Sequence, residues 1–249
     1  MKRIQREIEV WGTVLFLDVT SNVDLTAAFA KVESYVHQVD ETFSTYKSGS
    51  KVSQLRRGEI TIEQCPPELI EVWNQCLEVK ELTEGAFDPW AVAGGFDPSG
   101  LVKGWAADYS AEILKAAGAE HIQVNAAGDL ALRGGFTDQL PWSIGVVNPD
   151  NRLEILQTFE IQDGAIATSG TYERGAHIKD PHTGLIAIGA KSATVIGPNG
   201  AITDALATAL MVSGRDGAIW FTTPELAEYS AWVIDRHQEI AWSIGPATA

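Results

Sequence analysis

The sequence predicts an α+β fold in which helices pack on a mostly antiparallel sheet. Apolar residues recur at helical spacing mainly early in the chain, whereas short β-branched segments separated by Gly, Asn, Asp and Pro dominate its later part. Regular βαβ winding would instead alternate strands with helices throughout. The 249 residues include 45% hydrophobic residues, no internal repeat and no linker longer than a loop, which predicts a single compact domain over 1–249.

The N-terminal segment predicts one strand followed by a long helix. Residues 8–20 are β-branched and aromatic, as in a strand, and Gly12 within them would allow a ligand to approach the backbone. From Asn22, a candidate N-cap, apolar residues recur at helical spacing as far as Phe43. The polar stretch 45–50 then ends this helix.

Two further helices are expected before the strands begin. Pro66-Pro67 favours the first turn of a helix that runs to about Thr83, where Glu84-Gly85 ends it. A third helix is expected to begin near Lys103-Gly104 and to run towards Gly118.

The later part of the chain predicts short strands around one apolar helix at 203–213. That helix consists mainly of Ala, Leu, Met and Val, so we expect it to be buried. The expected strands are short segments bounded by turn residues, near 121–126, 129–134, 142–149, 155–161, 165–169, 190–197, 229–235 and 239–244.

The net charge, the N-terminus and the cysteines indicate which kinds of partner are disfavoured and which compartment is expected. Eighteen Lys and Arg against 33 Asp and Glu give a net charge of −15, which disfavours nucleic acid and anionic membranes as partners. The N-terminus is charged and has no apolar leader, and no stretch approaches the ~18 to 20 apolar residues of a membrane span. We therefore expect a cytoplasmic protein without a membrane anchor, with Cys65 and Cys76 as free buried or half-buried thiols.

Asp204 and Thr208 form the first candidate site. They are four residues apart in the apolar helix, hence on one face, and a buried carboxylate needs a cation or several hydrogen-bond donors. Hard oxygen ligands of this kind suit Mg²⁺. The alternative is that Thr203 or Asp204 caps the helix while Thr208 bonds back to a carbonyl.

His177 is the candidate base. It precedes Asp180-Pro181 and Thr183-Gly184, a turn-rich stretch of the kind that carries functional side chains. A histidine with an ordinary pKa of about 6.5 can take a proton from an attacking hydroxyl. The alternative is an ordinary exposed loop histidine.

A glycine-rich, aromatic tract at 85–104 ends at a helix start. Backbone N–H groups at such a start, together with Lys103, can hold a pyrophosphate. The tract matches neither the Walker spacing nor G-x-G-x-x-G, so neither a P-loop nor a Rossmann fold is predicted. Residues 167–174 add the three hydroxyls of two threonines and a serine, and an arginine, after an apolar strand. These groups either orient phosphate or form a polar loop.

Taken together and in this order, these segments resemble the ApbE family of flavin transferases. The resemblance spans nearly the whole chain and rests on Gly12-Thr13, TFSTY, GAFDPW, LVKGWAADY, VNAAGDLALRGG, AIATSGTYER, HIKDPHTG and TDALATALMVSG. It implies an ApbE, or T-fold-like, architecture and the activity of a Mg²⁺-dependent FAD:protein FMN transferase. Such an enzyme cleaves FAD, attaches FMN to a Ser or Thr of an acceptor protein and releases AMP.

The resemblance also implies a role for each matching residue. Mg²⁺ is expected on the side chains of Asp204 and Thr208 and on the backbone carbonyl of Gly100, with His177 as the general base towards the acceptor hydroxyl. The residues that the resemblance assigns to FAD are Trp11, Tyr46, Ala86, Phe87, Asp88, Asp97, Lys103 and Ile178.

The chain departs from the family's usual pattern at several positions. Trp11 stands where the family usually has methionine, Ala127 where it usually has a glycine, and Ile186 where a proline is common. Two other activities therefore stay open beside FMN transfer. Water could replace the acceptor hydroxyl, giving hydrolysis of FAD to FMN and AMP, or the protein could bind flavin without turnover.

Overall fold

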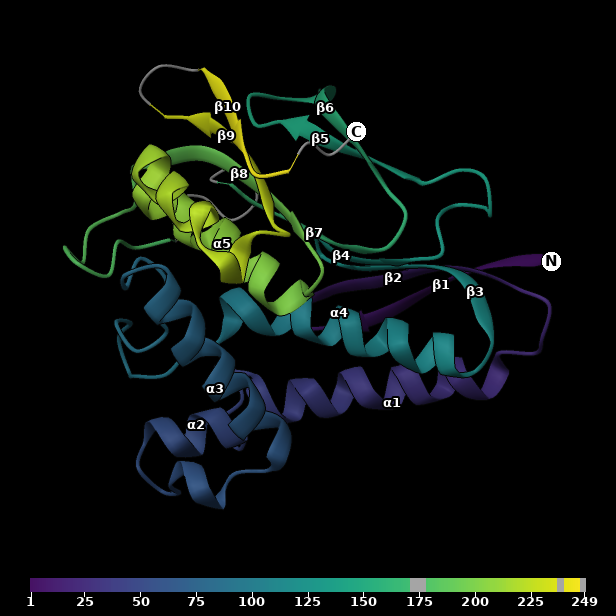
Figure 1. The fold of residues 1–249 in the computed structure, drawn as a ribbon. Helices are drawn as coiled ribbons and strands as arrows, with labels where there is room; N and C mark the ends of the chain where they lie inside the picture. The colour runs from purple at the N-terminus through teal and green to yellow at the C-terminus, as the bar shows by residue number, and fades with distance from the viewer. Residues whose placement is uncertain (171–177, 237–239, 247–249) are drawn as a thin grey trace.

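A computed structural model describes residues 1–170, 178–236 and 240–246. Its centre is an eight-stranded sheet in the order β1-β2-β3-β4-β7-β8-β9-β10, with antiparallel pairing between all neighbours (Figure 1). The fold-class prediction of helices on a mostly antiparallel sheet is confirmed. The strands of this sheet are β1 (Lys2–Val10), β2 (Thr13–Ser21), β3 (Ala119–Ala126), β4 (Asp129–Arg133), β7 (Gly164–Gly170), β8 (Ala190–Gly197), β9 (Ser230–Asp235) and β10 (Ala241–Ile244).

The helices gather on one face of this sheet. Helix α4 packs on β3 and β4, α5 packs on β7 and β8, and α1 lies outside α4 (Figure 1). The helices are α1 (Thr26–Phe43), α2 (Lys51–Arg56), α3 (Pro67–Leu82), α4 (Ser99–Ala116) and α5 (Gly200–Ser213), with short 3₁₀ turns at Ile62–Gln64, Gly214–Thr222 and Pro224–Leu226. None of the helices in the described ranges is long and apolar enough to cross a membrane.

A separate hairpin of β5 (Trp142–Asn148) and β6 (Asn151–Ile161) packs against the other face of the sheet. Successive side chains of β7 point to opposite faces of the sheet, towards the helices on one side and the β5–β6 hairpin on the other. Ile166 joins Trp142 and Phe159 of the hairpin, whereas Ala167 joins the core cluster that contains α5. A central strand covered on both faces explains why β7 is apolar along most of its length.

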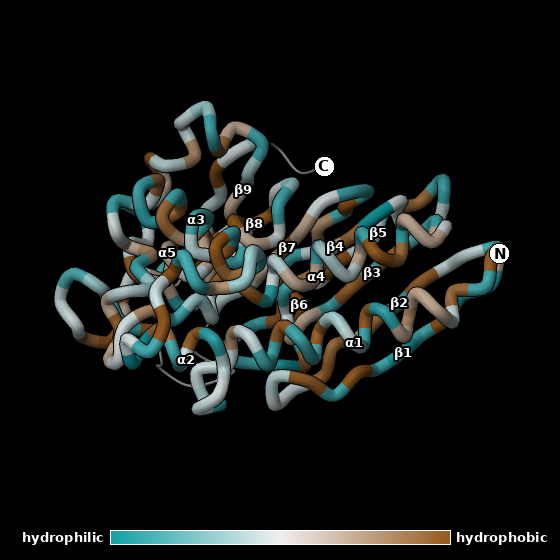
Figure 2. The backbone as a smooth tube through the Cα atoms, turned by 90° about the horizontal axis from the view of Figure 1, so that it is seen from below, coloured by the Kyte–Doolittle hydropathy of each residue, from teal (hydrophilic) through white to brown (hydrophobic). Residues whose placement is uncertain are grey.

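The predicted single strand at 8–20 is wrong, because two strands form a hairpin there. Trp11 and Gly12, with φ of 56° and 70°, make a two-residue turn between Val10 and Thr13. Positive φ at both central positions is typical of the tight turns that join antiparallel strands. Hydropathy does not predict most of β1, because β1 is the edge strand of the sheet, beside α1 (Figure 2). An edge strand tolerates charged residues.

Helix α1 begins at Thr26, so the predicted cap at Asn22 is wrong. The Asp24 carboxylate accepts the Thr26 N–H at 2.9 Å, while the Asn22 amide donates to Glu120 at 2.8 Å. Helix α2 was not expected. Its cap, Ser50, accepts the Ser53 N–H at 3.0 Å and lies within the polar stretch that had indicated only a loop.

Helices α4 and α5 both begin earlier than expected. Helix α4 starts at Ser99 and is kinked at Gly100, whose φ of −87° and ψ of 16° are not helical. Helix α5 starts at Gly200 and ends as predicted near residue 213. The helix expected from Pro67 to about Thr83 is confirmed as α3.

Both cysteines are free and buried, as expected. Burial also raises the pKa of each thiol, most strongly for Cys76, which favours the unreactive protonated form.

Candidate functional site

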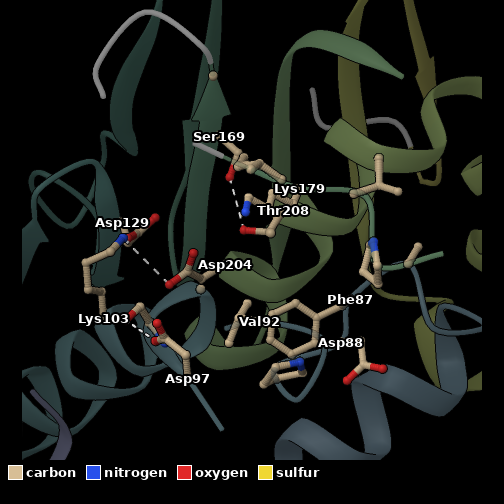
Figure 3. Close-up of a pocket in the computed structure, with 18 of the residues that line it drawn as sticks. Phe87, Asp88, Val92, Asp97, Lys103, Asp129, Ser169, Lys179, Asp204 and Thr208 are labelled. Atoms are coloured by element: carbon tan, nitrogen blue, oxygen red, sulfur yellow. Dashed lines mark hydrogen bonds and ion pairs between the residues drawn. The ribbon is translucent and has the colours of Figure 1, made fainter. Parts of the chain in front are cut away.

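A pocket of about 230 Å³ opens where the start of α4, the middle of α5 and the end of β7 meet (Figure 3). The segment that follows residue 177 completes one of its walls through Ile178, Lys179 and Pro181. The predicted site residues that line this pocket are Ala86, Phe87, Asp88, Asp97, Gly100, Lys103, Ile178, Asp204 and Thr208. Residues from distant parts of the chain therefore converge in one place.

Three predicted residues are not placed in this lining. Trp11 is half-buried in the β1–β2 turn and packs against both large core clusters. Tyr46 is 97% exposed and follows α1. His177 lies outside the described residues. The FAD contacts of Trp11 and Tyr46 and the role of His177 stay predictions.

Asp204 is one of two buried carboxylates of the pocket, the other being Asp129. It projects from α5, is only 3% exposed, and accepts the backbone N–H of Gly104 at 3.4 Å. The Lys103 ammonium lies 3.8 Å from it. These partners offset part of the cost of burying the carboxylate. Its role as a metal ligand stays a prediction.

The alternative that Thr203 or Asp204 caps α5 is wrong. Asn199 caps the helix, because its side chain accepts the Ile202 N–H at 3.0 Å. Thr203 bonds back to the Asn199 carbonyl at 2.6 Å, and the Thr208 hydroxyl lies 3.4 Å from the Ser169 hydroxyl. Asp204 lies in the second turn and is directed into the pocket (Figure 3).

Two glycines let α4 and α5 touch directly behind Asp204. A Cβ on Gly104 would lie 2.0 Å from the Gly200 carbonyl oxygen and 3.1 Å from the Asp204 Cβ. A Cβ on Gly200 would lie 2.6 Å from the Gly104 carbonyl oxygen. No side chain fits at this crossing, so the backbone contact fixes where α5 presents Asp204 and Thr208.

Gly100 brings the kinked start of α4 against Thr208. A Cβ at position 100 would lie 3.2 Å from the Thr208 Oγ1 and 3.3 Å from the Phe87 ring. The Asp204 carboxylate, the Thr208 hydroxyl and the Gly100 backbone therefore border one cavity. Within the described ranges no group of three His, Cys, Asp or Glu forms a metal cluster, so a cation here would depend on these mixed oxygen donors. They fit Mg²⁺, which prefers hard oxygens and retains several waters.

Lys103 links this centre to the β3–β4 turn. Its ammonium pairs with the Asp129 carboxylate as well as with Asp204 (Figure 3). Asp129, which is buried at the start of β4, had no predicted role, although the VNAAGD motif contains it. Ala127 and Gly128 form the turn before it with φ of 57° and 102°, so the alanine occupies the left-handed region and lines the pocket.

Two other carboxylates at the rim are already paired. Asp88 forms an ion pair with Lys80 at 2.7 Å. Asp97 accepts the Ser99 N–H at 3.0 Å and lies 3.9 Å from the Arg56 guanidinium. Asp97 thus stabilises the first turn of α4 at the edge of the pocket.

A half-buried ion pair supports the start of α5. Asp108 accepts the Gly200 N–H at 2.5 Å and the Arg133 guanidinium at 2.9 Å. Burial raises the pKa of Asp108, and the Gly200 N–H and Arg133 offset this only in part. The pair links α4, α5 and β4.

A second cavity of about 520 Å³ adjoins the first and shares Asp88 and Pro181 with it. It lies between α3 and the turn that contains His182. Because both are lined by Asp88 and Pro181, the two cavities meet at these residues.

Comparisons with known proteins agree with this architecture. The ApbE family model matches residues 9–95 and 92–232. A FAD:protein FMN transferase of Vibrio cholerae is 36% identical over 244 residues, covering 75% of this chain and 73% of that protein. A FAD:protein FMN transferase of Escherichia coli K12 is 31% identical over 157 residues, covering 55% of this chain and 45% of that protein.

Solved structures show the same fold. The flavin transferase ApbE from Vibrio cholerae superposes with a TM-score of 0.85 at 21% identity, over 99% of this chain and 98% of that one. The ApbE protein of Thermotoga maritima gives a TM-score of 0.83 at 21% identity, over 97% and 96% of the two chains. The family match, the relative from Vibrio cholerae and the shared fold lead to one conclusion: this chain belongs to the ApbE family.

Proposed function

We propose that the chain is a Mg²⁺-dependent FAD:protein FMN transferase. In this reaction FMN is attached through a phosphoester to a Ser or Thr hydroxyl of an acceptor protein, and AMP is released. The observation that carries the proposal is the convergence of Asp204, Thr208, Gly100 and Lys103 on one pocket in a chain of this family. The names of the relatives from Vibrio cholerae and Escherichia coli support the same activity.

The chemistry requires an attacking oxygen, a base and neutralisation of phosphate charge. The acceptor hydroxyl oxygen bonds to the FMN phosphorus, the bond from that phosphorus to the bridging oxygen breaks, and AMP leaves with the electron pair. The hydroxyl proton passes to a base, which we assign to His177. This histidine directly precedes Ile178, which lines the pocket.

We assign the Mg²⁺ ligands to the Asp204 carboxylate, the Thr208 hydroxyl and the Gly100 carbonyl. A bound Mg²⁺ would supply charge neutralisation on the phosphates. Lys103 forms ion pairs with Asp204 and Asp129. The other two carboxylates of the lining, Asp88 and Asp97, are paired at the rim with Lys80 and Arg56.

The remaining lining offers a surface for the flavin dinucleotide. Phe87 and Ile178 contribute apolar area for a ring system, and Asp97 can accept a hydrogen bond from ribose or adenine. Ala86 and Asp88 complete this wall. Trp11 and Tyr46 keep their proposed FAD contacts.

The test is to incubate the purified chain with FAD, Mg²⁺ and candidate acceptor proteins, then to weigh the acceptor and measure AMP. A gain of one FMN on the acceptor together with AMP supports transfer. AMP without an adduct indicates hydrolysis, and intact bound FAD without AMP indicates a flavin-binding protein; either result contradicts the proposal. An Asp216→Asn variant, altered at an exposed carboxylate away from the pocket, is the matched control for Asp204→Asn.

A further inference from the structure

The backbone of Lys179 is fixed by a turn that closes on itself. Residue 179 pairs with Ile186, the Ala187 N–H donates to the Ile178 carbonyl at 2.9 Å, and the Asp180 N–H donates to the Leu185 carbonyl at 2.8 Å. The Asp180 carboxylate accepts the His182 N–H at 2.9 Å, which holds the tip of the turn. The position of Lys179 at the pocket is therefore set by local hydrogen bonds.

The side chain of Lys179 belongs to the pocket although it is exposed to solvent. It lines the same cavity as Ser169 and Thr208, and in Figure 3 it is directed towards that wall. Among the residues that the structure describes, no carboxylate forms an ion pair with its ammonium. Lys103, the other lysine of the lining, is by contrast held by Asp129 and Asp204.

The charge balance of the pocket makes this lysine significant for an anionic ligand. The lining contains four aspartates, Asp88, Asp97, Asp129 and Asp204, and the whole chain has a net charge of −15. A diphosphate brings further negative charge into this field. Among the described residues, the Lys and Arg side chains that neighbour these aspartates form ion pairs with them. Beside the proposed Mg²⁺, a further placed cation would therefore add to the attraction for the phosphates.

We infer that Lys179 is a phosphate-binding residue of this site and contacts the diphosphate of the dinucleotide at the wall formed by Ser169 and Thr208. The inference rests on the proposed function, because it takes FAD as the ligand. An exposed lysine on a loop is ordinarily just solvated. Lys179 differs because its backbone is fixed and its side chain lies along the cavity that contains Asp204.

The experiment compares Lys179→Met with Lys179→Arg and the wild type. Methionine keeps most of the aliphatic length and removes the charge, whereas arginine keeps the charge. Lys31→Met, at an exposed lysine of α1, controls for the change in net charge. Affinities for FAD and for riboflavin, which has no phosphate, are measured by flavin fluorescence, and the FAD titration is repeated at several salt concentrations.

Loss of one charge-assisted contact predicts about tenfold weaker FAD binding for Lys179→Met and a shallower salt dependence. Lys179→Arg and Lys31→Met should bind FAD like the wild type, and riboflavin affinity should not change. Unchanged FAD affinity in Lys179→Met, or an equal loss for FAD and riboflavin, overturns the inference. AMP release and acceptor mass are measured separately from FAD affinity. If Lys179→Met weakens FAD binding but the wild type transfers no FMN, only the proposed function is refuted. If the wild type does not bind FAD, both the proposed function and the role of Lys179 are refuted.

Discussion

Replacing Gly104 with alanine should damage the site through the crossing of α4 and α5. The new Cβ would lie 2.0 Å from the Gly200 carbonyl oxygen, whereas Cβ atoms are not found closer than 3.0 Å to such neighbours, so the crossing must open by at least about 1 Å. Overpacking of this kind costs about 1 to 3 kcal/mol, and a backbone collision lies at the upper end. Alanine regains about 1 kcal/mol of helix propensity. We expect a net loss of about 2 kcal/mol in the free energy of unfolding.

Urea unfolding followed by circular dichroism measures that loss, and Mg²⁺-stimulated FAD cleavage measures its effect on the site. Gly49→Ala is the matched control, because a Cβ there meets no atom within 4 Å. Since α5 carries Asp204 and Thr208, opening the crossing should also lower FAD cleavage by at least tenfold at temperatures where the variant stays folded. Gly104→Ala that is as stable and as active as Gly49→Ala would refute this reasoning.

Three further predictions address the metal, the base and acid stability. Asp204→Asn should abolish Mg²⁺-stimulated FAD cleavage while circular dichroism stays native; EDTA-treated wild type that keeps full activity would contradict the metal assignment. His177→Ala should keep its FAD affinity but lose FMN transfer by at least a hundredfold, and weaker FAD binding with normal residual chemistry would argue against a base. Burial raises the pKa of Asp18, but hydrogen bonds from Arg3 and Gln5 more than offset this, so its pKa lies below the ordinary value. The resulting stabilisation is present above about pH 4 and is lost as the pH falls through the folded-state pKa. The difference in unfolding free energy between wild type and Asp18→Asn should therefore shrink below pH 4, and a difference that is constant with pH would exclude this explanation.

The parts of the fold that were predicted from sequence are those where local pattern and burial agree. Strand β8 and helix α3 have clear apolar patterns and flanking proline or glycine, and their bounds match closely. Residues 2–7 of β1 were missed because an edge strand tolerates charged residues and needs only one partner. Helix α2 was missed because six residues cannot show a helical period.

In the candidate site, the features that could not be predicted from the sequence are those that depend on tertiary contacts. The spacing of Asp204 and Thr208 placed both on one helical face, but it could not distinguish a cap from a pocket group, because the true cap is Asn199, before the predicted helix start. The pairing of Lys103 with Asp129 joins residues 26 positions apart and depends on how α4 packs on the sheet. Lys179 gave no sequence signal, because its significance comes from the cavity it borders.

The most direct measurement is a crystal structure of the protein with FAD and Mn²⁺, located by its anomalous signal in place of Mg²⁺. The account predicts one metal peak bounded by the Asp204 carboxylate, the Thr208 hydroxyl and the Gly100 carbonyl, with the FAD diphosphate against it. A metal bound elsewhere, or a diphosphate outside this pocket, would contradict it.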